Sequence, residues 1–204
     1  NCLSEFALIS ASLDFKNPID YGKRNEFVIK NPIIHERDEY IWLELEEGTS
    51  HADKIHSFLQ HTGGSVSSRQ AEDILTRKGL RVTRENISEH KNPDQFAREI
   101  MAEVHGQGVS PEGVIITSSG ANAFYSLFRS ARDSYVEKGK KIWIQLGWLY
   151  LDTIETMKMG GGEENIITLS NPGNEKELEK IFATHGNNIA GLVKRQTITF
   201  LPGF

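Results

Sequence analysis

Apolar runs of strand length alternate with helical segments along the C-terminal part of the chain, and this order constrains the fold more than any other feature. The apolar runs are residues 114–117, 141–146, 165–169 and 189–193, and the helical segments are residues 94–105, 121–138, 151–159 and 175–185. Such alternation is typical of parallel crossover units whose sheet is covered on both faces. The sequence therefore predicts an α/β fold, a three-layer sandwich with a mainly parallel sheet.

The turn after the first apolar run is a candidate anion site. Residues 113–123 read Gly-Val-Ile-Ile-Thr-Ser-Ser-Gly-Ala-Asn-Ala, so a short strand is predicted to turn at Ser118, Ser119 and Gly120 and enter a helix. The first N–H groups of a helix have no intrahelical partner, and they suit a phosphate or another anion. Gly120 lets the backbone approach closely, and the serine hydroxyls can add donors. Many strand–helix turns of this kind bind no ligand. When this motif is considered without the rest of the chain, that alternative stays open.

A second segment is expected at the same edge of the sheet. Ligands of doubly wound sheets lie outside the carboxyl ends of the strands, and Gly147-Trp148-Leu149-Tyr150 directly follows the run 141–146. In an extended backbone Trp148 and Tyr150 point to the same side, where an aromatic ring could lie flat against a planar ligand held by its phosphate at Gly120. The alternative is that both rings plug the edge of the sheet or a subunit interface.

Composition limits the classes of function. The chain of 204 residues is long enough for one domain with a substantial core, and its net charge of −5 does not favour a nucleic-acid partner. The single Cys2 excludes an intramolecular disulfide framework and a multi-cysteine zinc site, which fits a cytoplasmic protein. No apolar run is long enough to span a bilayer, and no secretory signal is recognisable, so we expect no membrane partner. Without an initiator Met or a closing element before Phe204, the sequence is expected to be a fragment or a processed piece.

The first 85 residues are harder to interpret. Short strands are expected at residues 26–29 and 40–45, and helices at residues 50–60 and 69–78. The polar segment His35–Asp38 interrupts the strand-like content, and either Ser67 or Ser68 can cap the second helix. We therefore separate residues 1–85, an N-terminal segment of uncertain fold, from residues 86–204.

Two further patterns have simple structural explanations. His51, His56 and His61 recur at intervals of five residues, which does not place them on one helix face, so solvated histidines are expected rather than metal ligands. The run Gly160-Gly161-Gly162 follows a helix rather than a strand, so we expect it to end the helix and not to form a nucleotide loop.

Three motifs occur in order and carry a family resemblance: Asn92-Pro93 before a helix, Ser118-Ser119-Gly120-Ala121, and Tyr150 followed three residues later by Thr153. At comparable separations, this set resembles the N-terminal part of the large domain of fold-type I pyridoxal-phosphate enzymes. The most similar branch is the Cys/Met-metabolism family of cystathionine γ-synthase and related transsulfuration enzymes. The resemblance covers about half of the chain, from Asn92 to Val193.

The resemblance implies a cofactor and a way of holding it. The phosphate of pyridoxal 5′-phosphate would be anchored at Ser119, Gly120 and Ala121, with the backbone amides of Gly120 and Ala121 as donors. Tyr150 would stack on the pyridine ring. The resemblance further implies elimination or replacement at the γ- or β-carbon of an amino-acid substrate, a homo-oligomer, and a role for residues 86–204 as part of the cofactor-binding large domain.

The chain also departs from the family pattern. The family places a Tyr and an Arg shortly before the Asn-Pro, where this chain has Ile87 and Glu89; a competing alignment assigns His61-Thr62-Gly63 to that element. Lys194-Arg195-Gln196-Thr197 stands where the family has an acidic residue and an Asn-Pro pair. The Schiff-base Lys is expected beyond Phe204, so no residue is assigned a catalytic role. The alternative function is a non-catalytic α/β module that binds a phosphorylated small molecule or a protein partner.

Overall fold

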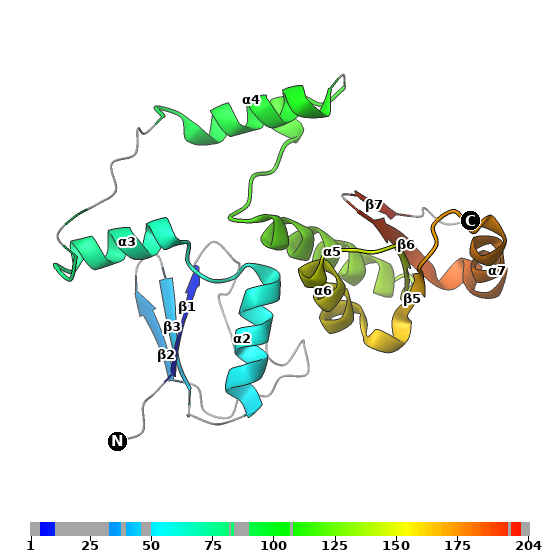
Figure 1. Cartoon of the computed structure of the whole chain (residues 1–204), viewed down its shortest axis with the longest axis horizontal. Coiled ribbons are helices and arrows are strands. Elements are labelled where there is room, and N and C mark those ends of the chain that lie inside the picture. Colours follow the sequence, from blue (N-terminus) through cyan, green and yellow to red (C-terminus); the bar gives the residue numbers. More distant parts are fainter. Residues whose placement is uncertain are drawn as a thin grey trace.

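The computed structural model describes residues 5–10, 33–37, 40–45, 50–81, 83, 90–106, 108–195 and 197–200. In this part of the chain, helices surround two separate sheets, so the predicted α/β class is confirmed (Figure 1). None of the described helices has the length and apolar character needed to cross a membrane.

The elements follow one another in a simple order. The strands are β1 (Glu5–Ser10), β2 (Ile33–Arg37), β3 (Tyr40–Leu45), β4 (Ile142–Leu146), β5 (Ile166–Leu169), β6 (Ile189–Lys194) and β7 (Thr197–Phe200). The α-helices are α2 (Ser50–Thr62), α3 (Ser68–Arg77), α4 (Pro93–His105), α5 (Gly120–Val136), α6 (Leu151–Gly161) and α7 (Glu175–His185). Single 3-10 turns are η1 (Pro111–Gly113), η2 (Glu163–Asn165) and η3 (Gly186–Asn188).

The first sheet is antiparallel, with the strand order β1-β3-β2. The sequence predicted β3 but not β1, and β2 crosses the polar segment that was expected to interrupt strand formation. That expectation was wrong because β2 is an edge strand, which pairs through its backbone from Ile33 opposite Glu44 to Arg37 opposite Tyr40 and tolerates charged residues. The strand expected at residues 26–29 lies outside the described residues.

A capping box fixes the start of α3. The Ser67 hydroxyl accepts a hydrogen bond from the Gln70 N–H at 3.2 Å, and the Gln70 side-chain oxygen accepts one from the Ser67 N–H at 3.0 Å. Of the two serines that the sequence offered as the cap, Ser67 is the one used, and Ser68 is the first helical residue.

The second sheet holds the elements that matter for function. Its order is β5-β4-β6-β7; the first three strands are parallel, and β7 runs antiparallel to β6. On one face, Phe128 of α5 and Trp143 of β4 are each 1% exposed, with ring centroids 4.7 Å apart. On the other face, Ile144 and Ile189 pack against Phe182 of α7. Helices therefore cover both faces of β4 and β6, which places the loops after these strands at one open edge.

The three-glycine run closes α6, as the sequence predicted. The helix ends at Gly161, and Gly162 follows with a φ of +82°, a conformation that other residues rarely adopt. Gly160 and Gly161 also lie close to the Phe128 and Trp143 rings, so side chains there would disturb the core.

Residues 114–117, expected to be a buried strand, do not form one. No strand of the described sheets pairs with this segment, and Ile115 is 83% exposed. The Val114 carbonyl instead accepts a hydrogen bond from the Arg98 side chain at 2.6 Å. The prediction was wrong because an apolar run indicates only that a segment is suited to burial. A strand also needs a neighbouring strand to pair with its backbone N–H and C=O groups, and the run itself does not provide one.

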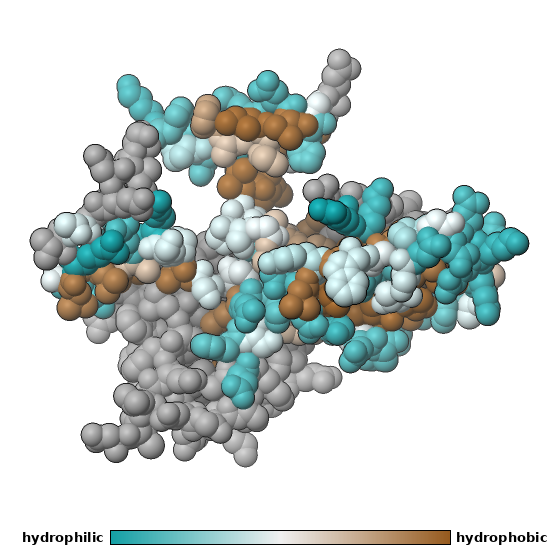
Figure 2. All heavy atoms as spheres, viewed as in Figure 1, coloured by the Kyte–Doolittle hydropathy of each residue, from teal (hydrophilic) through white to brown (hydrophobic). Residues whose placement is uncertain are grey.

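The helix α4 forms where it was expected, but the large apolar side chains along it are exposed. They are Phe96, Ile100, Met101 and Val104. Figure 2 shows the resulting hydrophobic surface along this helix. The described residues leave this face of α4 uncovered.

Candidate functional site

The turn before α5 has the geometry of an N-terminal helix site. Ser119 is the N-cap, with extended backbone angles, and its hydroxyl accepts a hydrogen bond from the Asn122 N–H at 3.1 Å. The Thr117 hydroxyl donates to the Ser119 carbonyl at 2.8 Å and so fixes the approach to the helix. Within the described part of the chain, no hydrogen bond engages the N–H of Gly120 or of Ala121. These are the two donors that the sequence assigned to an anion.

Two adjoining cavities lie at this turn. The smaller, of about 370 Å³, is lined by Ser119, Gly120, Ala121 and Tyr150, together with Phe124, Asp152 and Thr153. The structure thus brings together the four residues that the sequence singled out, although residues 121 and 150 lie far apart along the chain. The larger cavity, of about 970 Å³, shares Gly120 and Tyr150 with the smaller one and extends past Trp148 to Lys194 and Arg195. Volumes of this size accommodate a cofactor-sized molecule.

The aromatic segment after β4 lines the larger cavity. Trp148 and Tyr150 are 88% and 73% exposed, whereas Leu149 between them is 2% exposed and belongs to the core. This alternation places both rings on the same side, as the extended spacing predicted. The rings do not plug the sheet edge in the described structure, so that alternative is wrong. The alternative that both rings lie at a subunit interface stays a prediction.

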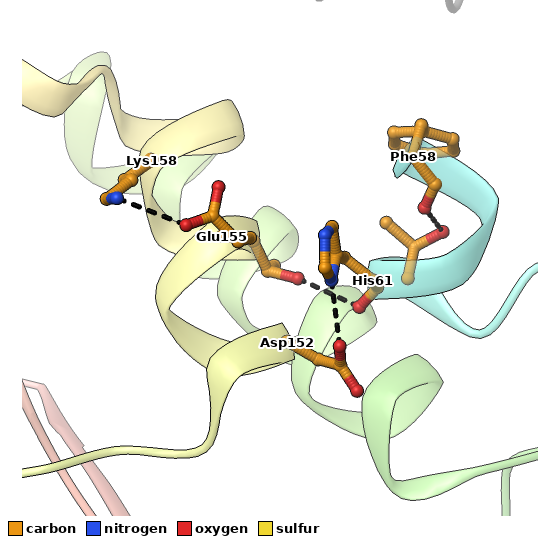
Figure 3. A network of polar contacts seen from close by, with 7 residues as sticks. Phe58, His61, Asp152, Glu155 and Lys158 are labelled. Atoms are coloured by element: carbon orange, nitrogen blue, oxygen red, sulfur yellow. Dashed lines mark hydrogen bonds and ion pairs between the residues drawn. The ribbon is translucent and has the colours of Figure 1, made fainter. Parts of the chain in front are cut away.

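The last turn of α2 packs against α5 and α6, beside the residues that line the smaller cavity. The sequence did not predict this contact. The His61 Nδ1 atom lies 2.8 Å from Asp152 Oδ1, and the Thr156 hydroxyl donates to the His61 carbonyl at 3.1 Å (Figure 3). The Asn122 side-chain amide donates to the Thr62 carbonyl at 3.4 Å. Side chains of α5 and α6 therefore bind the carbonyls that the end of α2 leaves without helical partners.

His61 corrects one prediction made from the sequence. It was expected to be solvated, as were His51 and His56, but it is 9% exposed and paired with Asp152, while His56 is exposed. The spacing of the histidines carried no sign of this, because the partner is 91 positions away. The side chain of His51 lies outside the described residues. The described residues contain no group of His, Cys, Asp and Glu side chains that could hold a metal ion.

Gly63 directly follows the end of α2 and lies against Ser119, the N-cap of α5. Its φ is +65°, and a Cβ atom there would overlap the Ser119 hydroxyl and approach the Asn122 nitrogen to 3.1 Å. A glycine is required both by the backbone conformation and by the close approach. The segment His61-Thr62-Gly63, which the sequence offered as an alternative family element, therefore lies directly against the candidate anion turn.

The charged side chains around the two cavities differ. Lys194 and Arg195 line the larger cavity, and Asp152 lines the smaller one beside its partner His61.

Two side chains farther along α5 and α6 have shifted pKa values. Burial raises the pKa of Tyr125 on α5, and Arg129, which donates to the phenol oxygen at 2.8 Å, partly opposes this effect. On α6, a hydrogen bond to Glu155 raises the pKa of Lys158.

Comparison with known proteins gives one informative similarity. The chain is 31% identical, over 142 residues, to the L-2-amino-4-chloropent-4-enoate dechlorinase/desaturase of Streptantibioticus cattleyicolor. The matched region is 68% of this chain but 28% of that protein, so the chain spans less than a third of its relative's length. No protein-family model matches the chain. No solved structure matches it either.

Proposed function

We propose that the chain forms part of an amino-acid-modifying enzyme that uses pyridoxal 5′-phosphate. The reaction would be an elimination or replacement at the β- or γ-carbon, of the transsulfuration type. The observation that carries the proposal is the convergence of Ser119, Gly120, Ala121 and Tyr150 on one cavity. The similarity to a protein named for dechlorination and desaturation of an amino acid supports an amino acid as the substrate.

The residues at the cavity fit this cofactor. The N–H groups of Gly120 and Ala121 lie at the positive end of the 17-residue helix α5, where a phosphate is stabilised. No protein atom lies within 4 Å of the position that a Cβ on Gly120 would take, so the turn has open space beside it. The exposed ring of Tyr150 offers a flat apolar surface next to this turn.

When bound, the cofactor supplies an electron sink for the carbanion of an amino acid. The chain contributes binding and orientation in this proposal. Ser119 shapes the start of α5 as its N-cap, and Tyr150 sets the plane of the ring. Lys194 and Arg195 make the far part of the larger cavity attractive to an anionic group of a substrate.

Larger-scale parts of the proposal follow from the same resemblance. We propose that residues 86–204 are part of a cofactor-binding large domain, and that the working protein is a cytoplasmic homo-oligomer. The apolar face of α4 that the described residues leave uncovered supports an oligomer, because exposed apolar patches of this kind mark interaction surfaces.

A second candidate is the non-catalytic module that binds a phosphorylated small molecule or a protein partner. One observation favours it: Lys194 is the one lysine that lines either cavity, and it lines the larger cavity but not the smaller one at the anion turn. The same cavity would then hold its ligand without a covalent bond.

A spectroscopic experiment separates the two candidates. Because the resemblance implies that the Schiff-base lysine lies beyond Phe204, a longer form of the protein that includes this lysine is incubated with pyridoxal 5′-phosphate, its visible spectrum is recorded, and the mixture is treated with borohydride before removal of free cofactor. Residues 1–204 alone are the control without this lysine. An enzyme with its lysine gives an absorption band near the visible edge and cofactor fixed to the protein. A module binds reversibly and retains nothing after borohydride. If no binding is detected, the cofactor proposal is wrong.

Variants of Tyr150 test the stacking role. Tyr150→Ala removes the ring and is expected to weaken cofactor binding about fivefold, since aromatic stacking contributes about 1 kcal/mol. Tyr150→Phe retains the ring and is the matched control, expected to bind almost as tightly as the parent. Equal affinity of the Ala variant and the parent would remove Tyr150 from the site.

A further inference from the structure

Asp152 lines the smaller cavity and is hydrogen-bonded to His61, and this pair has no part in the proposed function so far. The two side chains are 11% and 19% exposed, and His61 Nδ1 lies 2.8 Å from Asp152 Oδ1. Asp152 lies in the first turn of α6, two residues after Tyr150, and it lines the cavity together with Ser119, Gly120 and Ala121. A carboxylate is thus held beside the turn where the proposed function needs an anion.

The position of His61 is fixed from several sides. Its own carbonyl accepts the Thr156 hydroxyl, and the next carbonyl, of Thr62, accepts the Asn122 amide. Gly63 then packs against Ser119. The imidazole is therefore presented to Asp152 by a turn that α5 and α6 hold in place.

The electrostatics of the cavity depend on this pair. Among the residues that line the smaller cavity, Asp152 is the one with a charged side chain. A carboxylate accepts hydrogen bonds and cannot donate them when ionised, so the Nδ1–H of His61 is the donor. On α6, the charged side chains of Glu155 and Lys158 pair with each other. Without His61, no imidazole N–H would hold this carboxylate, which would be free to turn toward the bound anion, and like charges at close range repel.

We propose that His61 is a positioning residue for the anion site. It donates its Nδ1–H to Asp152 and holds this carboxylate in place, so that the turn at Ser119–Ala121 can bind a phosphate. The inference rests on the proposed function, and it gives the N-terminal segment a direct part in a site whose other residues come from the C-terminal half. It also identifies Asp152 as the charged side chain that would lie beside the bound phosphate.

The test is a double-mutant cycle on the full chain, read out by the equilibrium affinity for pyridoxine 5′-phosphate, with pyridoxine as the ligand that lacks the phosphate. His61→Ala is expected to raise the Kd for pyridoxine 5′-phosphate about tenfold, the effect of a carboxylate near the ligand that is no longer held by its hydrogen bond, and to leave pyridoxine binding unchanged. Asp152→Asn in the same background is expected to restore the affinity, because the repelling charge is then gone. His61→Asn, whose side-chain amide can replace the Nδ1–H donor, should restore it in part, and the exposed His56→Ala is the matched control.

Each outcome decides between explanations. If His61→Ala binds the phosphate as the parent does, or if the double variant binds as weakly as His61→Ala, the role of His61 is structural or absent and the inference is wrong. If His61→Ala weakens both ligands equally, the effect does not involve the anion and the inference is again wrong. If the parent binds neither ligand, the proposed function fails, and the inference that depends on it fails too. Thermal unfolding of each variant shows whether the fold is retained.

Discussion

Gly63 offers a sharp test of how α2 meets the candidate anion turn. Gly63→Ala combines two costs: a φ of +65°, which strains any residue with a Cβ, and overlap of the new methyl group with the Ser119 hydroxyl. Strain in this region costs about 1 kcal/mol. Displacing Ser119 from the N-cap of α5 costs about 1 kcal/mol more. We therefore expect Gly63→Ala to lower the free energy of unfolding by about 2 kcal/mol, as the sum of these two terms.

Gly79 provides the matched control. Its φ is +69°, but no atom lies within 4 Å of the position of an added Cβ, so Gly79→Ala should show the strain alone, about 1 kcal/mol. Urea unfolding, followed by circular dichroism, measures both variants. In a cycle with Ser119→Ala, the double variant should be less destabilised than the sum of the single variants, because the overlapping hydroxyl has been removed. Equal losses for Gly63→Ala and Gly79→Ala, or strict additivity with Ser119→Ala, would contradict the contact between Gly63 and the turn.

Three further predictions concern the core, the pH dependence and the turn. Phe128→Ala leaves a cavity beside Trp143 and should lower the free energy of unfolding by about 3–5 kcal/mol. Leu127 is half-exposed, so Leu127→Ala should lower it far less. Similar losses for the two variants would refute the burial of Phe128. Because burial raises the pKa of Tyr125, the folded state retains its proton better than the unfolded one, and the stability from this phenol is complete below about pH 10 and lost above it. Tyr125→Phe should therefore flatten the alkaline fall of stability in urea unfolding across about pH 9–11, and an unchanged slope would count against the shift. Gly120→Ala should leave thermal stability equal or higher, since the site has free space and Ala favours helices, yet weaken pyridoxine 5′-phosphate binding; tighter binding would contradict a ligand at this turn.

The second half of the fold could be predicted because local pattern and tertiary setting agree there. β4 and β6 are apolar runs that pair with each other in parallel and have helices on both faces, the setting that such runs indicate. Residues 114–117 show the limit of this reasoning, because the run has the same composition but no neighbouring strand among the described residues. β2 is the converse case. It forms as an edge strand through backbone pairing, and its polar sequence gives no sign of a strand.

The candidate site divides in the same way. Ser119, Gly120, Ala121 and Tyr150 could be named because each stands at the predicted start of a helix. The sheet-edge argument holds for Tyr150, which follows β4, but not for Ser119–Ala121, because the strand expected before them does not form. His61, Asp152 and Gly63 could not be named, because their roles depend on how the end of α2 docks against α5 and α6. A contact between residues 91 positions apart leaves no local pattern in a single sequence.

Nuclear magnetic resonance of backbone amides tests the central claim most directly. The amide signals of Gly120 and Ala121 in the full chain are followed during titration with pyridoxine 5′-phosphate, and again with pyridoxine. Our account predicts large, saturable shifts of these two amides with the phosphorylated compound, and much smaller ones with pyridoxine. Shifts that are equal for both compounds, or that leave Gly120 and Ala121 unaffected, would contradict it.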